Sequence, residues 1–109
     1  MAIGLQRKTV RVVGYDSTWP TLYQSEASLI RARLGFEVCN VAHIGSTAVP
    51  GLEAKPIIDI MLGVRSLRVP EALFAALSEL GYEHRPYDDI SDRLFFAKAV
   101  GALRTHNLS

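Results

Sequence analysis

A glycine–serine pair and one aspartate are the residues of this 109-residue sequence whose types and spacing best suit chemistry. Gly45-Ser46 ends the apolar run Val38–Ile44, and Asp59 interrupts a second apolar run, Ile57–Val64. A Gly-Ser turn at a strand end presents backbone N–H groups and a hydroxyl, which suit a phosphate. A carboxylate on the neighbouring strand suits a Mg²⁺ ion that the phosphate would share. The spacing predicts a site for phosphate chemistry with Mg²⁺ as its cofactor, without identifying the substrate.

Other residues near this pair have both a structural and a functional interpretation. His43 precedes the Gly-Ser turn and is either a half-buried strand-end histidine or a residue that flanks the site. Lys55 offers a point charge to a phosphate, although a lysine beside a loop is more often solvated. Arg104 and His106 have the same parity in a predicted C-terminal strand, Leu103–Ser109, and would share one face of that strand. If that face also carries Asp59, both cations converge on the site.

Two helices are expected to support this site. Asp16-Ser17-Thr18-Trp19-Pro20 predicts a helix start, with capping residues and a proline suited to the first turn, and the helix should run to about Leu34. Its apolar side is expected to bury Trp19, Leu22, Tyr23, Ala27, Leu29, Ile30 and Leu34, with Gln24, Glu26, Arg31 and Arg33 toward solvent. A second helix is predicted from Val69-Pro70-Glu71 to about Leu80, because proline stands at its start and Gly81 past its end.

About five strands complete the expected fold. After a flexible lead-in at residues 1–9, strands are predicted at 10–13, 38–44, 57–64, 93–99 and 103–109, the first being an edge strand. Residues 82–85 are expected to form a short strand or an extended arm. Residues 86–92 form an acidic loop, interpreted as a solvated turn, with a metal-ligand role as the alternative. This order of elements predicts an α/β (α+β) fold, a mixed sheet with helices packed on it, as a single domain over 10–109.

The composition disfavours several classes of function. The net charge of +1 leaves no general basic field of the kind that nucleic-acid binding uses. No apolar run approaches the length of a membrane span, and Met1–Lys8 lacks the apolar core of a signal peptide. Cys39 stands alone in an apolar run, which predicts a buried small side chain and no intrachain disulfide. We expect a cytoplasmic protein with no membrane or nucleic-acid partner.

The string around the candidate site carries a specific resemblance. His43–Leu52, followed by Lys55–Ile60, closely resembles the signature of the GrpB family, a group of poorly characterised bacterial proteins with a nucleotidyltransferase-like fold. The likeness extends to Tyr15-Asp16 with Trp19, to Arg93–Phe96 with Lys98, and to Arg104–His106, so that it covers the chain from about residue 10. Some members are fused to dephospho-CoA kinase, which implies association with an enzyme of the CoA pathway.

The resemblance implies a role for each candidate residue. In the nucleotidyltransferase layout a Gly-Ser backbone holds terminal phosphates while strand carboxylates bind a divalent metal, which neutralises developing charge. On this layout Asp59 is the metal ligand and catalytic carboxylate. The residues expected to contact phosphate or nucleotide are Gly45, Ser46, Thr47, Lys55, Arg104 and His106.

Three departures from the pattern bear on activity. Met61 stands where active nucleotidyltransferases usually carry a second acid, a lack that GrpB-like proteins generally share. After Arg104-Thr105-His106 the chain reads Asn107-Leu108-Ser109, where the family tends to have a further histidine-containing run. Relatives commonly extend tens of residues further, so we expect a C-terminally short form whose uncovered sheet edge favours a homo-oligomer.

Three hypotheses remain open at this point. The first is a Mg²⁺-dependent nucleotidyl- or phosphoryl-transferase-like protein that takes a nucleotide-like small molecule. The second is a non-catalytic module that binds a nucleotide- or CoA-related ligand as an accessory to a partner enzyme. The third is structural, with Asp59 in a buried ion pair with Arg104 or His106 and no ligand.

Overall fold

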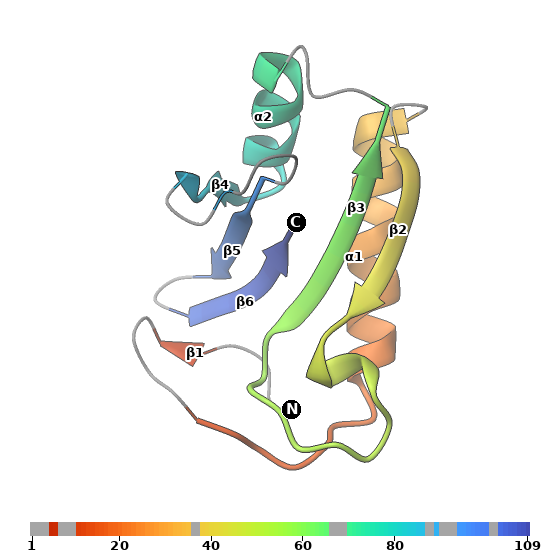
Figure 1. Cartoon of the computed structure of the whole chain (residues 1–109), viewed down its shortest axis with the longest axis vertical. Helices are drawn as coiled ribbons and strands as arrows, with labels where there is room; N and C mark the ends of the chain where they lie inside the picture. The colour runs from red at the N-terminus through yellow and green to blue at the C-terminus, as the bar shows by residue number, and fades with distance from the viewer. Residues whose placement is uncertain are drawn as a thin grey trace.

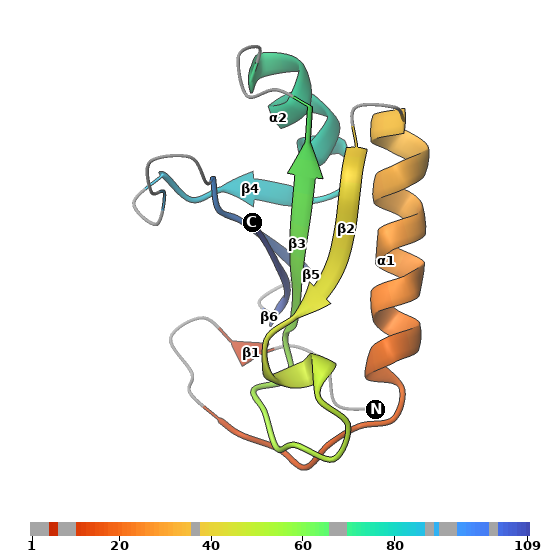
Figure 2. The ribbon, with the colours of Figure 1, turned by 45° about the vertical axis from the view of Figure 1, so that its right-hand side comes forward.

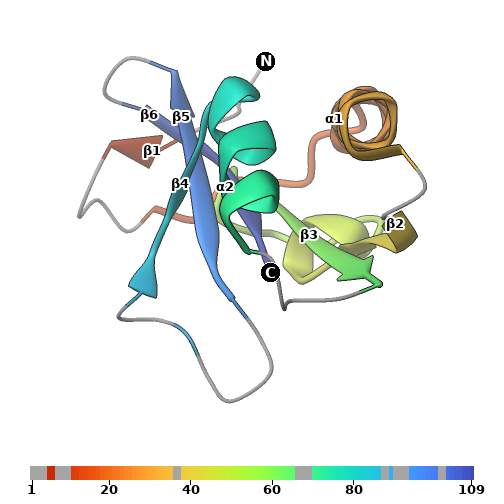
Figure 3. The same cartoon turned by 90° about the horizontal axis from the view of Figure 1, so that it is seen from above.

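Helices α1 (Trp19–Leu34) and α2 (Pro70–Glu79) cover one face of a mixed β-sheet, as Figures 1, 2 and 3 show from three sides. This arrangement comes from a computed structural model. It describes residues 5–6, 11–35, 38–65, 70–86, 89, 94–100 and 103–109. The described part of the chain contains no helix long and apolar enough to cross a membrane.

The sheet is built from five strands in the order β2-β3-β6-β5-β4, with a further short strand, β1, paired to β6. The strands are β1 Leu5–Gln6, β2 Val38–Ile44, β3 Ile58–Val64, β4 Tyr82–His84, β5 Phe96–Val100 and β6 Leu103–Leu108. All neighbouring pairs are antiparallel except β3 with β6, which are parallel. The predicted mixed sheet of about five strands with two helices is confirmed.

The N-terminal expectations are only partly met. Leu5–Gln6, assigned to a flexible lead-in, form β1 because they pair with Leu103 and Arg104, the residues of β6 that precede its pairing with β3. The predicted strand at 10–13 is reduced to an isolated bridge between Val13 and Ala54, while Val10 lies outside the described residues. In both cases the pairing depends on a partner that is distant in sequence: β6 for Leu5–Gln6 and Ala54 for Val13.

Helix α1 begins and ends where its sequence predicts. The carboxylate of Asp16 accepts hydrogen bonds from the backbone N–H and hydroxyl of Thr18, and Pro20 lies in the first turn. Trp19 and Ile30 are fully buried and pack with Ile58 and Ile60 of β3 in the core. The core therefore lies between the helices and one face of the sheet.

Three side chains depart from their predicted exposure. Leu29, expected in the core, is 49% exposed, whereas Glu26, expected in solvent, is only 4% exposed because side chains from β4 and β5 reach it. Cys39, expected to be buried, is exposed. An irregularity in the β2–β3 register between Val38 and Asn40 disturbs the alternation that would have turned Cys39 inward.

The acidic loop has a structural role at its one described aspartate. Asp89 Oδ2 lies 2.8 Å from Nε2 of His84, and its Oδ1 accepts the backbone N–H of Phe95 at 2.8 Å. Asp89 therefore joins the end of β4 to the start of β5. The other two aspartates of this loop lie outside the described residues, so the metal-ligand alternative for them stays a prediction.

Candidate functional site

Gly45 and Asp59 form the centre of the candidate site because the strand register places them side by side. Ile44 is the register partner of Asp59 between β2 and β3, and Gly45 follows at once. Gly45 has φ 74° and ψ −171°, a conformation essentially restricted to glycine. A Cβ atom at this position would lie 2.6 Å from Oδ2 of Asp59. The Gly45 backbone thus approaches the carboxylate more closely than any other residue type would allow.

A short 3₁₀ turn, Ser46–Ala48, follows Gly45 directly. Its first hydrogen bond runs from the N–H of Ala48 to the carbonyl of Gly45 at 3.1 Å. The N–H groups of Ser46 and Thr47 precede that bond, at the start of the turn, where a helical turn leaves its donors without partners inside the turn. The predicted geometry of a Gly-Ser turn beside a strand carboxylate is therefore present.

Asp59 is half-buried and is hydrogen-bonded by Asn107. The side-chain amide of Asn107, on the neighbouring strand β6, donates to Oδ1 of Asp59 at 3.1 Å. Burial raises the pKa of Asp59, while the hydrogen bond from Asn107 and the charges of Lys55 and His43 act in the opposite direction. Asn107 was not among the predicted site residues, because nothing in the sequence indicates that β6 pairs with β3 in this register.

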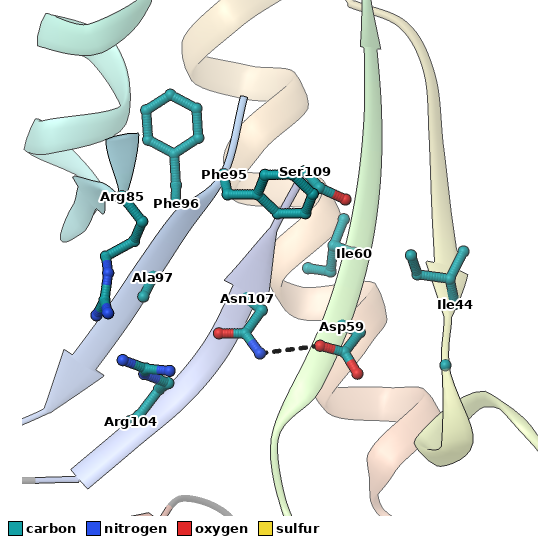
Figure 4. Close-up of a pocket in the computed structure, with 11 residues that line it drawn as sticks. Ile44, Asp59, Ile60, Arg85, Phe95, Phe96, Ala97, Arg104, Asn107 and Ser109 are labelled. Carbon is teal, nitrogen blue, oxygen red and sulfur yellow. Dashed lines mark hydrogen bonds between the residues drawn. The ribbon is translucent and has the colours of Figure 1, made fainter. Parts of the chain in front are cut away.

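A cavity of about 390 Å³ opens in front of Asp59, and Figure 4 shows the side chains around it. Two arginines line this cavity together with Gly45, Asp59 and Asn107: Arg85, which follows β4, and Arg104 of β6. Ile44, Ile60, Phe95, Phe96, Ala97 and Ser109 complete the lining. Arg104 was predicted at the site and the structure places it there. Arg85 was missed, because only the sheet order brings the end of β4 across to this cavity.

His106 does not join Arg104, and the prediction that the two share a face is wrong. In the β5–β6 register Ala99 pairs with Arg104 and Lys98 pairs with His106, so β6 contains one extra residue, Thr105. Such a bulge reverses the alternation of side chains. Arg104 consequently lines the cavity, whereas His106 lies on the helix-covered face, with its Nε2 3.9 Å from Oε1 of Glu26.

A buried polar cluster surrounds Glu26 on that helix-covered face. The hydroxyl of Tyr82 donates to Oε2 of Glu26 at 2.7 Å, and Nζ of Lys98 lies 3.0 and 3.1 Å from its two carboxylate oxygens. Burial raises the pKa of Tyr82, and the charge of Glu26 adds to this effect. Burial lowers the pKa of His106, and the charge of Glu26 opposes this change. The cluster holds α1 against β4, β5 and β6, directly behind the bulge.

His43 and Thr47 form a second structural unit, away from the cavity. The His43 ring stacks on Tyr23 of α1 with 4.9 Å between ring centroids, and its Nε2 lies 2.9 Å from the hydroxyl of Thr47. Thr47 is 1% exposed and its hydroxyl also reaches the carbonyl of Ile57 at 3.5 Å. Burial lowers the pKa of His43, although the charge of Asp59 acts against this. The side chain of Thr47 is thus engaged in packing the turn.

The remaining predicted phosphate contacts, Ser46 and Lys55, are exposed and do not line the cavity. Lys55 nevertheless lies close enough for its charge to lower the pKa of Asp59. Among the described residues, no ion pair joins Asp59 to Arg104 or His106, and His106 lies on the other face. The hypothesis of a buried ion pair predicted a cation beside Asp59, but the side chain that is hydrogen-bonded to Asp59 is the neutral amide of Asn107.

The oxygen atoms present fit a Mg²⁺ ion that is shared with a ligand. In the described part of the chain, no group of three or more His, Cys, Asp or Glu side chains is placed to hold a metal. Asp59 supplies one carboxylate, whose Oδ2 faces Gly45, and Asn107 supplies an adjacent amide. Mg²⁺ is commonly held by one or two carboxylates together with substrate phosphates. These residues therefore fit a metal that enters with a phosphate, rather than one bound by the protein alone.

Comparison with known proteins identifies the family. Residues 9–109 match the family model described as GrpB protein. UPF0157 protein PA4798 of Pseudomonas aeruginosa is 40% identical over 102 residues, covering 91% of this chain and 42% of that protein. A dephospho-CoA kinase of Mycolicibacterium paratuberculosis is 36% identical over 81 residues, covering 72% of this chain and 20% of that protein.

A solved structure gives the same result. The crystal structure of the conserved protein GrpB from Enterococcus faecalis superposes with a TM-score of 0.82 at 33% identity, covering 90% of this chain and 59% of that one. The chain thus spans about half the length of these GrpB relatives, between 42% and 59%. The matched signature, the shared sheet and helices, and the level of identity together show that this chain belongs to the GrpB (UPF0157) family.

Proposed function

We propose that the cavity is a nucleotidyl- or phosphoryl-transferase-like site that takes a nucleotide-like small molecule together with Mg²⁺. The observation that carries the proposal is a half-buried carboxylate, Asp59, in contact with the Gly45 backbone and in the same cavity as two arginines. A carboxylate and two guanidinium groups that line one cavity suit a ligand that brings both phosphate and a divalent cation.

Each residue of the cavity has a defined part in this proposal. Asp59 would hold the metal through the carboxylate that Asn107 orients, and the Gly45 backbone, which also lines the cavity, would lie beside the phosphate. The bound metal supplies neutralisation of the charge that develops on the phosphoryl oxygens. Lys55, although outside the cavity lining, would add positive charge near the metal ligand, since its charge already acts on Asp59.

A non-catalytic binding module is the second candidate, and one observation favours it. Among the described residues, Asp59 is the only acidic side chain that lines the cavity, while Met61, two residues further along β3, is 39% exposed. Transferases with two metals need more than one carboxylate. In this form the protein would bind a nucleotide- or CoA-related ligand beside a partner. The similarity to a segment of a dephospho-CoA kinase supports an enzyme of the CoA pathway as that partner.

Thermal unfolding with a panel of nucleotides and CoA, each with Mg²⁺ and with EDTA, tests both candidates. A ligand that binds the folded state raises Tm by mass action. A Mg²⁺-dependent increase that Asp59→Asn abolishes supports the transferase-like site. An increase that survives EDTA and Asp59→Asn supports the binding module. The matched control is Glu53→Gln, which removes an exposed acid outside the cavity and should leave every shift unchanged. No shift with any phosphate-bearing compound would reject both.

A further inference from the structure

Two arginines from distant parts of the chain meet in one half of the cavity. Arg85 follows β4, where its backbone N–H donates to the carbonyl of Phe95 at 2.6 Å, and Arg104 lies on β6. The strand between them, β5, presents Ala97 to the cavity. Figure 4 shows the side chains of Arg85 and Arg104 approaching one another next to this alanine. The small side chain of Ala97 leaves that space open.

The charges in the cavity are arranged in two parts. In Figure 4 Asp59 lies at one end and the two arginines at the other, with Asn107 between them. Gly45 also lines the cavity and lies close to Asp59. The planar guanidinium fork of an arginine matches the oxygens of a phosphate, so both arginines suit a phosphoryl group that enters this part of the cavity.

From this arrangement we propose that Arg85 and Arg104 form a clamp for a phosphoryl group separate from the one held at Asp59 and Gly45. The phosphoryl group at Asp59 and Gly45 belongs to the proposed function, and the inference rests on that function for this group. It narrows the ligand to compounds that carry a diphosphate, such as a nucleoside diphosphate or triphosphate. A monophosphate contacts only one of these two groups of residues, whereas a diphosphate has a phosphoryl group for each. A cavity volume of about 390 Å³ falls within the range of small-molecule sites.

Calorimetric titration with inorganic pyrophosphate, inorganic phosphate and malonate, all in EDTA, tests the clamp directly. We expect pyrophosphate to bind more tightly than phosphate or malonate. Arg85→Gln and Arg104→Gln should each weaken pyrophosphate binding by about tenfold, since each removes a charge-assisted hydrogen bond. Arg104→Lys should recover only part of the loss, because lysine keeps the charge but not the fork. Arg31→Gln, which removes an exposed arginine of α1 outside the cavity, is the matched control and should bind normally.

Two further titrations distinguish failure of the clamp from failure of the proposed function: pyrophosphate binding in the presence of Mg²⁺, and the same measurement on the variant Asp59→Asn. If the arginine variants bind pyrophosphate as the wild type does, the clamp is overturned, whatever Asp59 does. If the arginine variants weaken pyrophosphate binding in EDTA, the clamp is supported. If Mg²⁺ then changes the pyrophosphate affinity of the wild type and of Asp59→Asn equally, the metal site at Asp59 is rejected. Phosphate binding as tight as pyrophosphate would overturn the diphosphate class, and tighter malonate binding would overturn a phosphoryl ligand. If Arg104→Gln fails to fold, Arg85→Gln alone decides the outcome.

Discussion

Gly45 lies so close to Asp59 that a Cβ atom on the glycine would come within 2.6 Å of the carboxylate oxygen Oδ2 and within 3.3 Å of Cβ and Cγ of Asp59. The contact joins the turn that ends β2 to the carboxylate on β3, and it places a backbone, not a side chain, against the acid. Asp59 also lines the cavity, so a ligand that enters the cavity can reach the acid. Glycine is therefore required here for the site as well as for the turn.

Gly45→Ala should destabilise the protein and disturb the site. Alanine is strained at a φ of 74°, and its methyl group would force Asp59 to rotate away from Asn107. We expect a loss of about 3 kcal/mol in the free energy of unfolding, from backbone strain together with the displaced carboxylate. Urea denaturation measures this loss.

Gly51→Ala is the matched control for backbone strain alone. Gly51 also has a positive φ, of 81°, but a Cβ atom there meets no heavy atom within 4 Å. We expect this variant to lose about 1 kcal/mol. Equal losses for the two alanine variants would contradict the role assigned to the contact with Asp59.

Removing the charge of Glu26 should be far more damaging than its position on α1 suggests. Glu26→Gln leaves Lys98, whose side chain is 18% exposed, without the carboxylate that neutralises it. Breaking a buried ion pair costs about 3 kcal/mol, whereas replacing both partners by apolar groups costs much less. We therefore expect Glu26→Gln/Lys98→Met to be more stable than Glu26→Gln in a double-mutant cycle measured by urea denaturation.

The ion pair between Arg33 and Glu79 provides the comparison for that cycle. Its side chains are 44% and 61% exposed, so water already screens the two charges. Glu79→Gln should change stability by less than about 0.5 kcal/mol. A loss at Glu79 as large as that at Glu26 would show that burial is not the cause.

Asp59→Asn should make the folded protein more stable near neutral pH. Burial raises the pKa of Asp59 above its ordinary value of 3.8, so the folded state retains this proton more readily than the unfolded chain does. The contribution of Asp59 to stability is full below 3.8 and is lost as the pH rises through the raised pKa. The advantage of asparagine should thus shrink in unfolding measurements made from about pH 7 down to about pH 4. A constant difference across this range would contradict a raised pKa.

His106 should make the protein sensitive to mild acid. Burial lowers the pKa of His106 below the ordinary value of 6.5, with the charge of Glu26 opposing the change and that of Lys98 adding to it. Its contribution to stability is full above 6.5 and is lost as the pH falls through the lowered pKa.

His106→Gln tests this effect. The variant should show a flatter dependence of unfolding free energy on pH between about pH 7 and about pH 5 than the wild type. Burial also lowers the pKa of His43, so His43→Gln should flatten the profile in the same direction. An unchanged profile in both variants would refute these two assignments.

Local patterns in the sequence determined the boundaries of the main elements. The proline at 20 and the glycine at 35 define α1, and the apolar runs at 38–44 and 57–64 become β2 and β3 within one residue. The Gly-Ser turn and Asp59 also meet as predicted, because two consecutive antiparallel strands joined by a loop are adjacent in space. Capping, turn chemistry and side-chain alternation act over a few residues, so they can be read from the chain itself.

Only the tertiary structure decided which long-range partners complete the site. A single extra residue in β6, Thr105, sends Arg104 into the cavity and His106 to the other face, and side-chain parity cannot reveal such a bulge. The parallel pairing of β3 with β6 brings Asn107 to Asp59 across 48 positions of sequence separation. Glu26 becomes buried because Tyr82 and Lys98, on two other strands, supply its hydrogen bonds. These outcomes depend on register and on the satisfaction of buried polar groups, which are properties of the assembled sheet and not of any one segment.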